Sequence, residues 1–269
     1  MNSASGRLTK DGIRIYEPVD YAGMAEAGRI AATILDEIAP HIFVGQTTAE
    51  LDGIITEMVT AHGAKSATIG YKGYQHASCI SVNHVVCHGI PADKRIKEGD
   101  ILNIDVTVIL DGWYGDTSRM YAVGKLPRKS ERLIQVTHDA LFKGISAVMP
   151  GNSFGDIGYA IQTYVENHRM SVVKDFCGHG LGQVFHAPPN VLHYGQPGTG
   201  PVLEEGMFFT IEPMVNLGRS ETKVLADDWT AVTRDKSLSA QFEHSVGVTA
   251  TGVEIFTLSP ANSFHPTYK

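Results

Sequence analysis

Four carboxylates lie in segments whose other residues favour buried β-strands. They are Asp105 in LNIDVTVIL, Asp116 in YGDTSRMY, Glu212 in MFFTIEPMV and Glu243 in SAQFEHSVGV. Removing one carboxylate from water costs several kcal/mol even after relaxation, whereas a whole domain is stable by only about 5–15 kcal/mol. A fold that buries all four acids must therefore place positive charge beside them.

The source of this positive charge is constrained by the sequence, because Arg119 is the only lysine or arginine inside the four segments. Two divalent metal ions would neutralise four carboxylates. For any single acid, a solvent-facing charge on an edge strand is the simpler interpretation. The four acids together indicate a metal site.

The first two acids fall on one face of a predicted hairpin. Side chains alternate between the two faces of a strand, so in residues 102–110 an apolar face opposes a polar face that carries Asp105 and Thr107. Asp111-Gly112 predicts a two-residue turn. This register puts Thr107 opposite Asp116 and Asp105 diagonal to it, about 7–8 Å away at the backbone. A bulge would change the register.

The same alternation recurs in the second half of the chain. Thr210 and Glu212 share a face, and Gln241 shares one with Glu243 and its polar neighbours Ser239 and Ser245. His244 follows Glu243, so we expect it to point to the opposite face and not to be a ligand.

Three histidines lie where the chain turns near predicted strands. His179 in FCGHGLG has glycines on both sides, which let the backbone bring an imidazole close to a crowded centre. His88 in VCHGIP and His186 in VFHAPP precede Gly or Pro turn residues. These three are the candidate site histidines, whereas those in helical patterns have solvated or capping roles as the default.

The order of predicted elements indicates an α+β protein. Residues 1–17 are predicted to be a polar tail, and residues 18–269 a single catalytic domain. Helices are expected at 20–40, 47–63, 129–148 and 153–168, and strands at 78–87, 100–110, 113–124, 171–177, 206–216, 221–234 and 239–249. Helices followed by strands, twice over, predict two related halves at about 18–125 and 126–257.

Composition excludes several classes of protein. With 269 residues, 43% hydrophobic and 19% charged, the chain is typical of a soluble globular protein. A net charge of −7 argues against general nucleic-acid binding. We find no signal-type apolar region and no run near the ~18 apolar residues of a membrane span. Three cysteines without a CxxC pair favour a reducing cytoplasm.

The sequence resembles the methionine aminopeptidases of the bacterial type I class. The motifs that carry the resemblance occur in order from about residue 10 to residue 257, nearly the whole chain: SCISVNHVVCHGIP, NIDVTV, GWYGDTSRM, CGHGLG, FHAPP, FTIEPM, DDWTAVTRD and QFEHSV. The resemblance implies the pita-bread fold, in which two pseudo-symmetric halves surround a curved antiparallel sheet flanked by helices.

The resemblance also implies a dinuclear metal centre. Its ligands would be Asp105, Asp116, His179, Glu212 and Glu243, with Asp105 chelating one metal, His179 and Glu212 binding the other, and Asp116 and Glu243 bridging. The metals would be Co²⁺, Mn²⁺, Fe²⁺ or Zn²⁺, among which the sequence does not choose.

The implied reaction removes the N-terminal methionine of nascent proteins and peptides, with a small second residue preferred. A metal-activated water would attack the first peptide bond, with Glu212 as general base. His186 would stabilise the oxyanion, and His88 would hydrogen-bond near the scissile amide. The methionine pocket would be formed by Tyr71, Tyr74, Cys79, Phe185 and Trp229, since thioethers pack well against aromatic edges.

Further expectations follow from the same resemblance. A monovalent cation is expected near Asn83, Val85 and Ser239, and a transient partner is the ribosome. We expect a cytoplasmic monomer with no nucleic-acid readout and no membrane association. No cysteine-rich zinc extension precedes residue 20, and no large insertion interrupts the second half.

Two alternatives share the fold. Prolidase and aminopeptidase P use the same five-ligand centre, but they normally carry an additional N-terminal domain for which this chain has no room. A non-catalytic binding protein on this fold typically loses metal ligands, whereas all five are present here.

Overall fold

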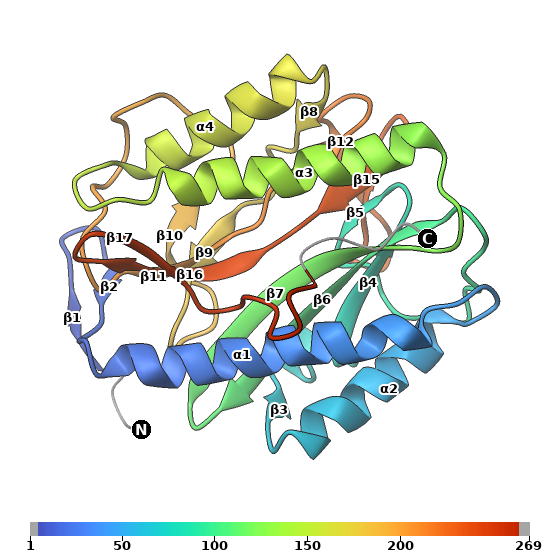
Figure 1. Cartoon of the computed structure of the whole chain (residues 1–269), viewed down its shortest axis with the longest axis horizontal. Coiled ribbons are helices and arrows are strands. Elements are labelled where there is room, and N and C mark those ends of the chain that lie inside the picture. Colours follow the sequence, from blue (N-terminus) through green and yellow to red (C-terminus); the bar gives the residue numbers. More distant parts are fainter. Residues whose placement is uncertain (1–4, 264–269) are drawn as a thin grey trace.

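Two pairs of helices enclose a set of strands in the computed structural model, which describes residues 5–263. Helices α1 (Asp20–Ile38) and α2 (Thr48–Ala61) lie on one side of the strands. Helices α3 (Arg128–Ser146) and α4 (Phe154–Asn167) lie on the other (Figure 1). The predicted α+β class is confirmed. The ends of the predicted tail and of the predicted catalytic domain, residues 1–4 and 264–269, lie outside the described residues.

The strands are short, apart from one long hairpin, and each pairing between them within residues 5–263 is antiparallel. Their bounds, with two short 3₁₀ helices, are β1 (Arg7–Leu8), β2 (Arg14–Ile15), η1 (Ala39–His41), β3 (Lys65–Ser66), η2 (Tyr71–Gly73), β4 (Ser78–Val82), β5 (Val85–Cys87), β6 (Ile101–Leu110), β7 (Trp113–Ala122), β8 (Ser171–Val172), β9 (Gly178–Gly180), β10 (Ala187–Val191), β11 (Phe208–Ile211), β12 (Met214–Asn216), β13 (Thr222–Val224), β14 (Ala231–Thr233), β15 (Ser239–Gln241), β16 (His244–Thr249) and β17 (Gly252–Ile255).

The long hairpin β6–β7 has the predicted register. Thr107 pairs with Asp116, so the turn is the expected Asp111-Gly112. Both turn residues have positive φ, 49° for Asp111 and 87° for Gly112, as a type I′ turn requires. The turn chemistry therefore fixes which side chains of the hairpin share a face, and Asp105 and Asp116 share one.

Each helix pair buries its own apolar cluster against the strands. Isoleucine and leucine side chains of α1 and α2 pack on β4, β6 and β7, and those of α3 and α4 pack mainly on strands of the second half. The predicted capping box starts α2: the Thr47 side chain accepts a hydrogen bond from the Glu50 backbone N–H, and the Glu50 carboxylate accepts one from the Thr47 N–H. The strands are thus held between two rigid helical layers.

Several predicted strands are interrupted. The stretch 206–216 divides into β11 and β12, with Glu212 and Pro213 between them, and 239–249 divides at Phe242 and Glu243 into β15 and β16. Pro213 has no N–H for a strand ladder. The two acids of the second half therefore project from breaks in strands rather than from within them.

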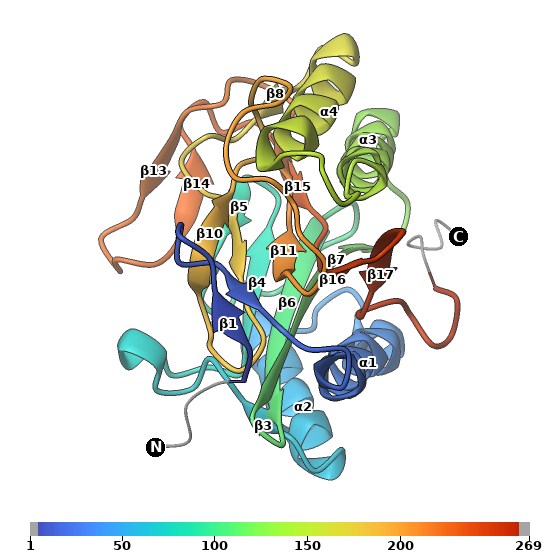
Figure 2. The ribbon, with the colours of Figure 1, turned by 90° about the vertical axis from the view of Figure 1, so that its left-hand side faces the viewer.

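Other differences from the predicted strands follow from local sequence. The stretch 221–234 forms the β13–β14 hairpin, which lies on the side of the molecule facing away from α1 and α3 (Figure 2). Strand β8 covers only the first two residues of the predicted 171–177. Strands β9 and β10 were not predicted, because their sequences GHG and APPNV are rich in residues that strands usually exclude.

The prediction of a polar tail is wrong for residues 5–17. Strands β1 and β2 pair with each other, and Ile13, Ile15 and Tyr16 are buried. The Tyr16 N–H donates to the Gly206 carbonyl at 2.8 Å, which joins this segment to the second half of the chain. The alternation of apolar and polar residues in GIRIYE is the strand signal that the high local polarity obscured.

Among residues 5–263, no helix is long and apolar enough to cross a bilayer.

The ion pair between Arg119 of β7 and Asp36 of α1 ties the long hairpin to the helical layer. Its N···O distance is 2.6 Å, and both side chains are about nine-tenths buried, at 11% and 10% exposure. Asp36 also accepts hydrogen bonds from the Ser259 hydroxyl and the Ala261 N–H. The positive charge of Arg119 is therefore paired with the carboxylate of Asp36.

We predict that Arg119→Met lowers the free energy of unfolding by about 3–5 kcal/mol, because it leaves a buried carboxylate without its cation. The matched control is Arg29→Met, which breaks an exposed pair with Glu26 and should cost less than about 1 kcal/mol. Urea denaturation of both variants measures the difference, and equal losses would contradict the assignment.

Candidate metal centre

Five side chains from both halves of the chain meet in one cavity of about 730 Å³. Asp105 comes from β6, Asp116 from β7 and His179 from β9, while Glu212 and Glu243 come from the two strand interruptions. The structure thus brings together all five residues that the sequence proposed as ligands. Their individual roles stay predictions.

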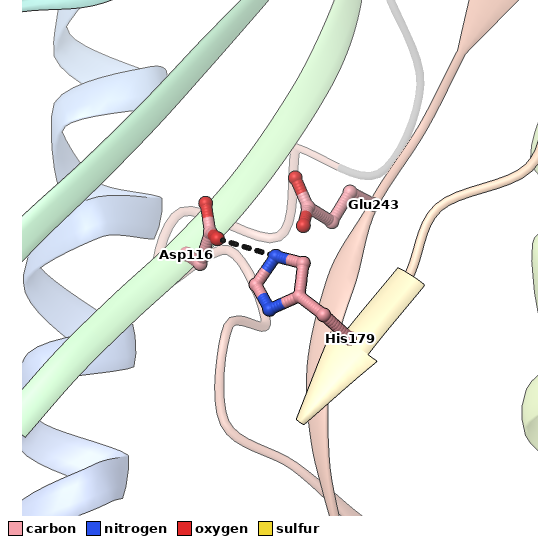
Figure 3. A group of neighbouring side chains, drawn as sticks. All are labelled: Asp116, His179 and Glu243. Atoms are coloured by element: carbon pink, nitrogen blue, oxygen red, sulfur yellow. Dashed lines mark ion pairs between the residues drawn. The ribbon is translucent and has the colours of Figure 1, made fainter. Parts of the chain in front are cut away.

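Asp116, His179 and Glu243 form the tightest group. One potential ligand atom from each lies within 4.8 Å of the others, and Figure 3 shows the three side chains pointing toward one another. His179 Nε2 is 3.4 Å from Asp116 Oδ2 and 3.8 Å from Glu212 Oε1. The site therefore presents several carboxylate oxygens around one imidazole nitrogen.

The backbone around His179 is packed too closely for side chains on its neighbours. A Cβ at Gly178 would lie 2.4 Å from the Thr210 carbonyl oxygen, and one at Gly180 would lie 2.1 Å from the Pro188 carbonyl oxygen. The predicted reason for the two glycines is confirmed: they let β9 fit between β10 and β11 and carry the imidazole into the centre.

Hydroxyl and amide groups hold the carboxylates in place. The Thr107 hydroxyl donates to Asp116 Oδ1 at 2.7 Å. Glu212 is held at both oxygens, since Thr210 donates to Oε1 at 2.8 Å and Gln241 donates to Oε2 at 3.2 Å. These partners lie on the polar faces that strand alternation identified.

The acids lie close enough together to repel one another. Burial raises the pKa of Asp105 and Glu243 well above the ordinary carboxyl range, and the neighbouring carboxylates raise both further. Burial also raises the pKa of Glu212 to about 7, against an ordinary value of 4.5. Burial by itself lowers the pKa of His179, but Asp116 and Glu212 raise it above its ordinary value.

This electrostatic environment fits divalent cations. Arg119, the one basic residue of the acidic segments, is paired with Asp36, so it does not neutralise the four acids. Carboxylate oxygens with one imidazole are a donor set that Mn²⁺, Fe²⁺, Co²⁺ and Zn²⁺ accept. The residues present therefore fit the metal that the sequence predicted.

His88 and His186 also face the cavity, from outside the tight group. Both have positive φ, 54° and 58°, a backbone conformation that non-glycine residues adopt mainly in tight turns and at functional sites. Burial lowers the pKa of His88, and it lowers the pKa of His186 to about 4. Each imidazole is therefore neutral near pH 7 and has one N–H to donate.

The residues predicted for the methionine pocket line the same cavity, in two groups. Tyr71 packs against Phe185 and His186, with ring centroids 4.9 and 5.2 Å apart. Tyr74 packs against Trp229, with centroids 4.8 Å apart, and Cys79 lies opposite Asp105 in the β4–β6 register. The cavity thus combines an acidic centre with aromatic walls.

His244 turns away from the cavity, as the strand alternation predicted. Its Nδ1 lies 2.9 Å from the hydroxyl of Thr257, and it is absent from the residues that line the acidic cavity. Sequence reasoning missed two contributors to the site. Asp11, in the segment predicted to be a tail, lines the cavity, and the ring of His193 contacts the main chain of Glu212.

Comparison with known proteins assigns the chain to a family. The model of metallopeptidase family M24 matches residues 22–250, most of the chain. This chain belongs to metallopeptidase family M24. It is therefore a metal-dependent hydrolase, as the sequence predicted.

The relatives and solved structures narrow the assignment. A methionine aminopeptidase of Rickettsia prowazekii is 56% identical over 95% of this chain and 99% of its own length. One from Escherichia coli strain K12 is 50% identical over 91% of this chain and 94% of its own length. A crystal structure of the Rickettsia prowazekii enzyme matches with a TM-score of 0.91 and 57% identity, over 91% of this chain and 100% of that chain. The predicted resemblance and the pita-bread fold are confirmed.

We predict that the charge on Glu212 destabilises the metal-free protein. Its folded-state pKa, about 7, exceeds the ordinary 4.5, so the unfolded chain releases this proton first as pH rises. Relative to Glu212→Gln, the metal-free wild type should lose up to about 3 kcal/mol of unfolding free energy between pH ~4.5 and ~7.

Denaturation in EDTA across this pH range measures the difference, and repeating it with excess Mn²⁺ provides the control. Bound metal should remove the loss for the wild type. A difference between the two proteins that does not change with pH would contradict the electrostatic description of the site.

Proposed function

We propose that this chain removes the N-terminal methionine from polypeptides, with a small second residue preferred. The observation that carries the proposal is the cavity itself, in which five potential ligands lie beside two neutral histidines and an aromatic wall. The identity to methionine aminopeptidases over nearly the full chain supports the same function.

The residues that would hold two divalent cations are Asp105, Asp116, His179, Glu212 and Glu243. When bound, the cations supply positive charge that lowers the pKa of water and polarises a carbonyl oxygen. Four negative charges and one neutral imidazole match the charge of two such ions. Asp105 would chelate at one side, His179 and Glu212 at the other, with Asp116 and Glu243 between them.

Glu212 is the proposed general base. A general base has to lie within hydrogen-bond reach of the proton that it takes, and Glu212 lines the cavity together with the other proposed ligands. Hydrogen bonds from Thr210 and Gln241 restrain both of its oxygens. Glu212 would take a proton from the attacking water and deliver it to the leaving amine.

His186 and His88 are the proposed contacts to the peptide. The N–H of neutral His186 would donate to the oxygen that becomes negative as water adds to the first peptide bond. His88 would hydrogen-bond near the scissile amide or the leaving nitrogen. Their rings are held by aromatic neighbours, His186 by Phe185 and His88 by Trp229, at centroid distances of 3.8 and 6.1 Å.

Selectivity for methionine would come from the remaining cavity wall, formed by Tyr71, Tyr74, Cys79, Phe185 and Trp229. A thioether side chain packs favourably against aromatic ring edges. The hydroxyl of Tyr74 donates to the Ser78 carbonyl at 2.9 Å, so its ring has a fixed position. A rigid apolar wall favours one unbranched side chain over larger or branched ones.

Further parts of the proposal rest on resemblance. A monovalent cation is proposed at Asn83, Val85 and Ser239; in support, the Asn83 carbonyl accepts a hydrogen bond from the Ser239 N–H at 2.9 Å. Action on nascent chains implies a transient encounter with the ribosome. A cytoplasmic monomer without nucleic-acid or membrane partners completes the proposal.

Peptide hydrolysis separates the proposal from its alternatives. Purified protein with added Mn²⁺ should release methionine from Met-Ala-Ser. Preferential cleavage of an Xaa-Pro bond would indicate a prolidase-like or aminopeptidase P-like enzyme, and a metal-free, inert protein would indicate a binding function.

We predict that Glu212→Ala abolishes detectable turnover of Met-Ala-Ser, because one change removes both a ligand and the base; the loss of a base alone typically costs about 10²–10⁴-fold. Glu205→Ala, at an exposed glutamate outside the cavity, is the control and should retain full activity. A near-normal kcat for Glu212→Ala would overturn the assignment.

A further inference from the structure

The main chain at Glu212 lacks the hydrogen-bond partner that a continuous strand would provide. The pairing of β11 with β16 ends at Ile211, and the pairing of β12 with β15 starts at Met214. A buried backbone N–H that is left unpaired costs free energy comparable to a lost hydrogen bond. The N–H of Glu212 therefore requires an acceptor from elsewhere in the fold.

His193 supplies that acceptor. The Glu212 N–H donates to His193 Nε2 at 3.1 Å, and the His193 side chain is fully buried, with 0% exposure. Because Nε2 accepts, the ring hydrogen of the neutral imidazole lies on Nδ1. Among residues 5–263, Nδ1 has no hydrogen-bond partner.

The one polar contact that the ring makes within the described residues is the contact to Glu212. An apolar side chain of similar size would fill the same space but would leave the Glu212 N–H without an acceptor, at a cost of about 1–3 kcal/mol. The polar role of His193 within the fold is therefore directed at Glu212.

The chain segment that carries His193 is packed against helix α4. His193 follows β10, and its chain segment lies against α4 so closely that a Cβ at Gly158 would be 2.8 Å from the Leu192 carbonyl oxygen and 2.4 Å from that of Tyr194. The Gly195 N–H donates to the Gln162 side chain of α4 at 3.2 Å. The position of the imidazole is thus set by a packed helix, not by a mobile loop.

We propose that His193 is a positioning residue, which fixes the main chain of Glu212 and thereby the direction of its carboxylate toward metal and substrate. The inference rests on the proposed function and assigns to it a residue outside the cavity wall. Thr210 and Gln241 restrain the carboxylate oxygens of Glu212, and His193 restrains the backbone of the same residue.

The expected size of the effect follows from how such sites respond to small displacements. Catalytic groups must be held within about 0.5 Å of the productive geometry. Loss of a group that orients a metal ligand typically reduces metal affinity or activity by about 10–100-fold. The loss should appear in kcat rather than in KM, because His193 does not line the cavity.

Three substitutions of the same residue test the proposal. His193→Phe keeps a buried ring and removes the acceptor. His193→Gln places an amide oxygen near the position of Nε2, whereas the shorter His193→Asn places it near the position of Nδ1. We expect Phe and Asn to lower kcat on Met-Ala-Ser and the affinity for Mn²⁺ by about 10–100-fold, with KM within about 3-fold of wild type, and Gln to recover most of both.

Mn²⁺ calorimetry on the metal-free proteins gives a result independent of catalysis. The proposed function fails, and the positioning role stands, if the wild-type protein does not cleave Met-Ala-Ser but the His193→Phe variant still binds Mn²⁺ more weakly than the His193→Gln variant. A His193→Phe variant with the kcat and the Mn²⁺ affinity of the wild type would overturn the inference. Equal losses in Phe, Asn and Gln, accompanied by equal losses in thermal stability, would also overturn it.

Discussion

Repulsion among four neighbouring carboxylates, of which Asp116 and Glu243 are buried and Asp105 and Glu212 partly exposed, governs the organisation of the site. Asp105, Asp116, Glu212 and Glu243 converge on one cavity, and the arginine of their own segments is paired with Asp36. Burial and mutual repulsion raise the pKa of Asp105, Glu212 and Glu243. Among the described residues, no lysine or arginine forms an ion pair with these four acids, which makes the site a receptor for further positive charge.

The architecture supplies the rigidity that such a concentration of charge requires. Two helical layers hold the strands from both sides, with separate apolar clusters behind each half (Figure 1). The long β6–β7 hairpin presents two acids in fixed register, and the strand interruptions present the other two. Glycines beside His179 bring the imidazole among them. The centre is therefore formed by residues within strands and by residues at the interruptions between strands.

The parts of this arrangement that could be predicted from sequence are those that depend on neighbours along the chain. Strand alternation and the Asp111-Gly112 turn predicted the shared face of Asp105 and Asp116, and the capping box predicted the start of α2. The break at Glu243, whose N–H donates to the Ser118 carbonyl, and the role of His193 depend on contacts between distant segments. The buried N-terminal segment was missed because its polar neighbours obscured the strand signal in GIRIYE, and its contact with Gly206 is distant in sequence.

The proposed function requires the five side chains to bind two divalent cations at one centre. This requirement can be tested in a crystal structure of the protein grown with Mn²⁺, with anomalous differences measured at the manganese edge. The expected result is two anomalous peaks in the cavity, both within coordination distance of side chains from the set Asp105, Asp116, His179, Glu212 and Glu243. Peaks elsewhere, or an anomalous map without peaks among these five residues, would contradict the claim.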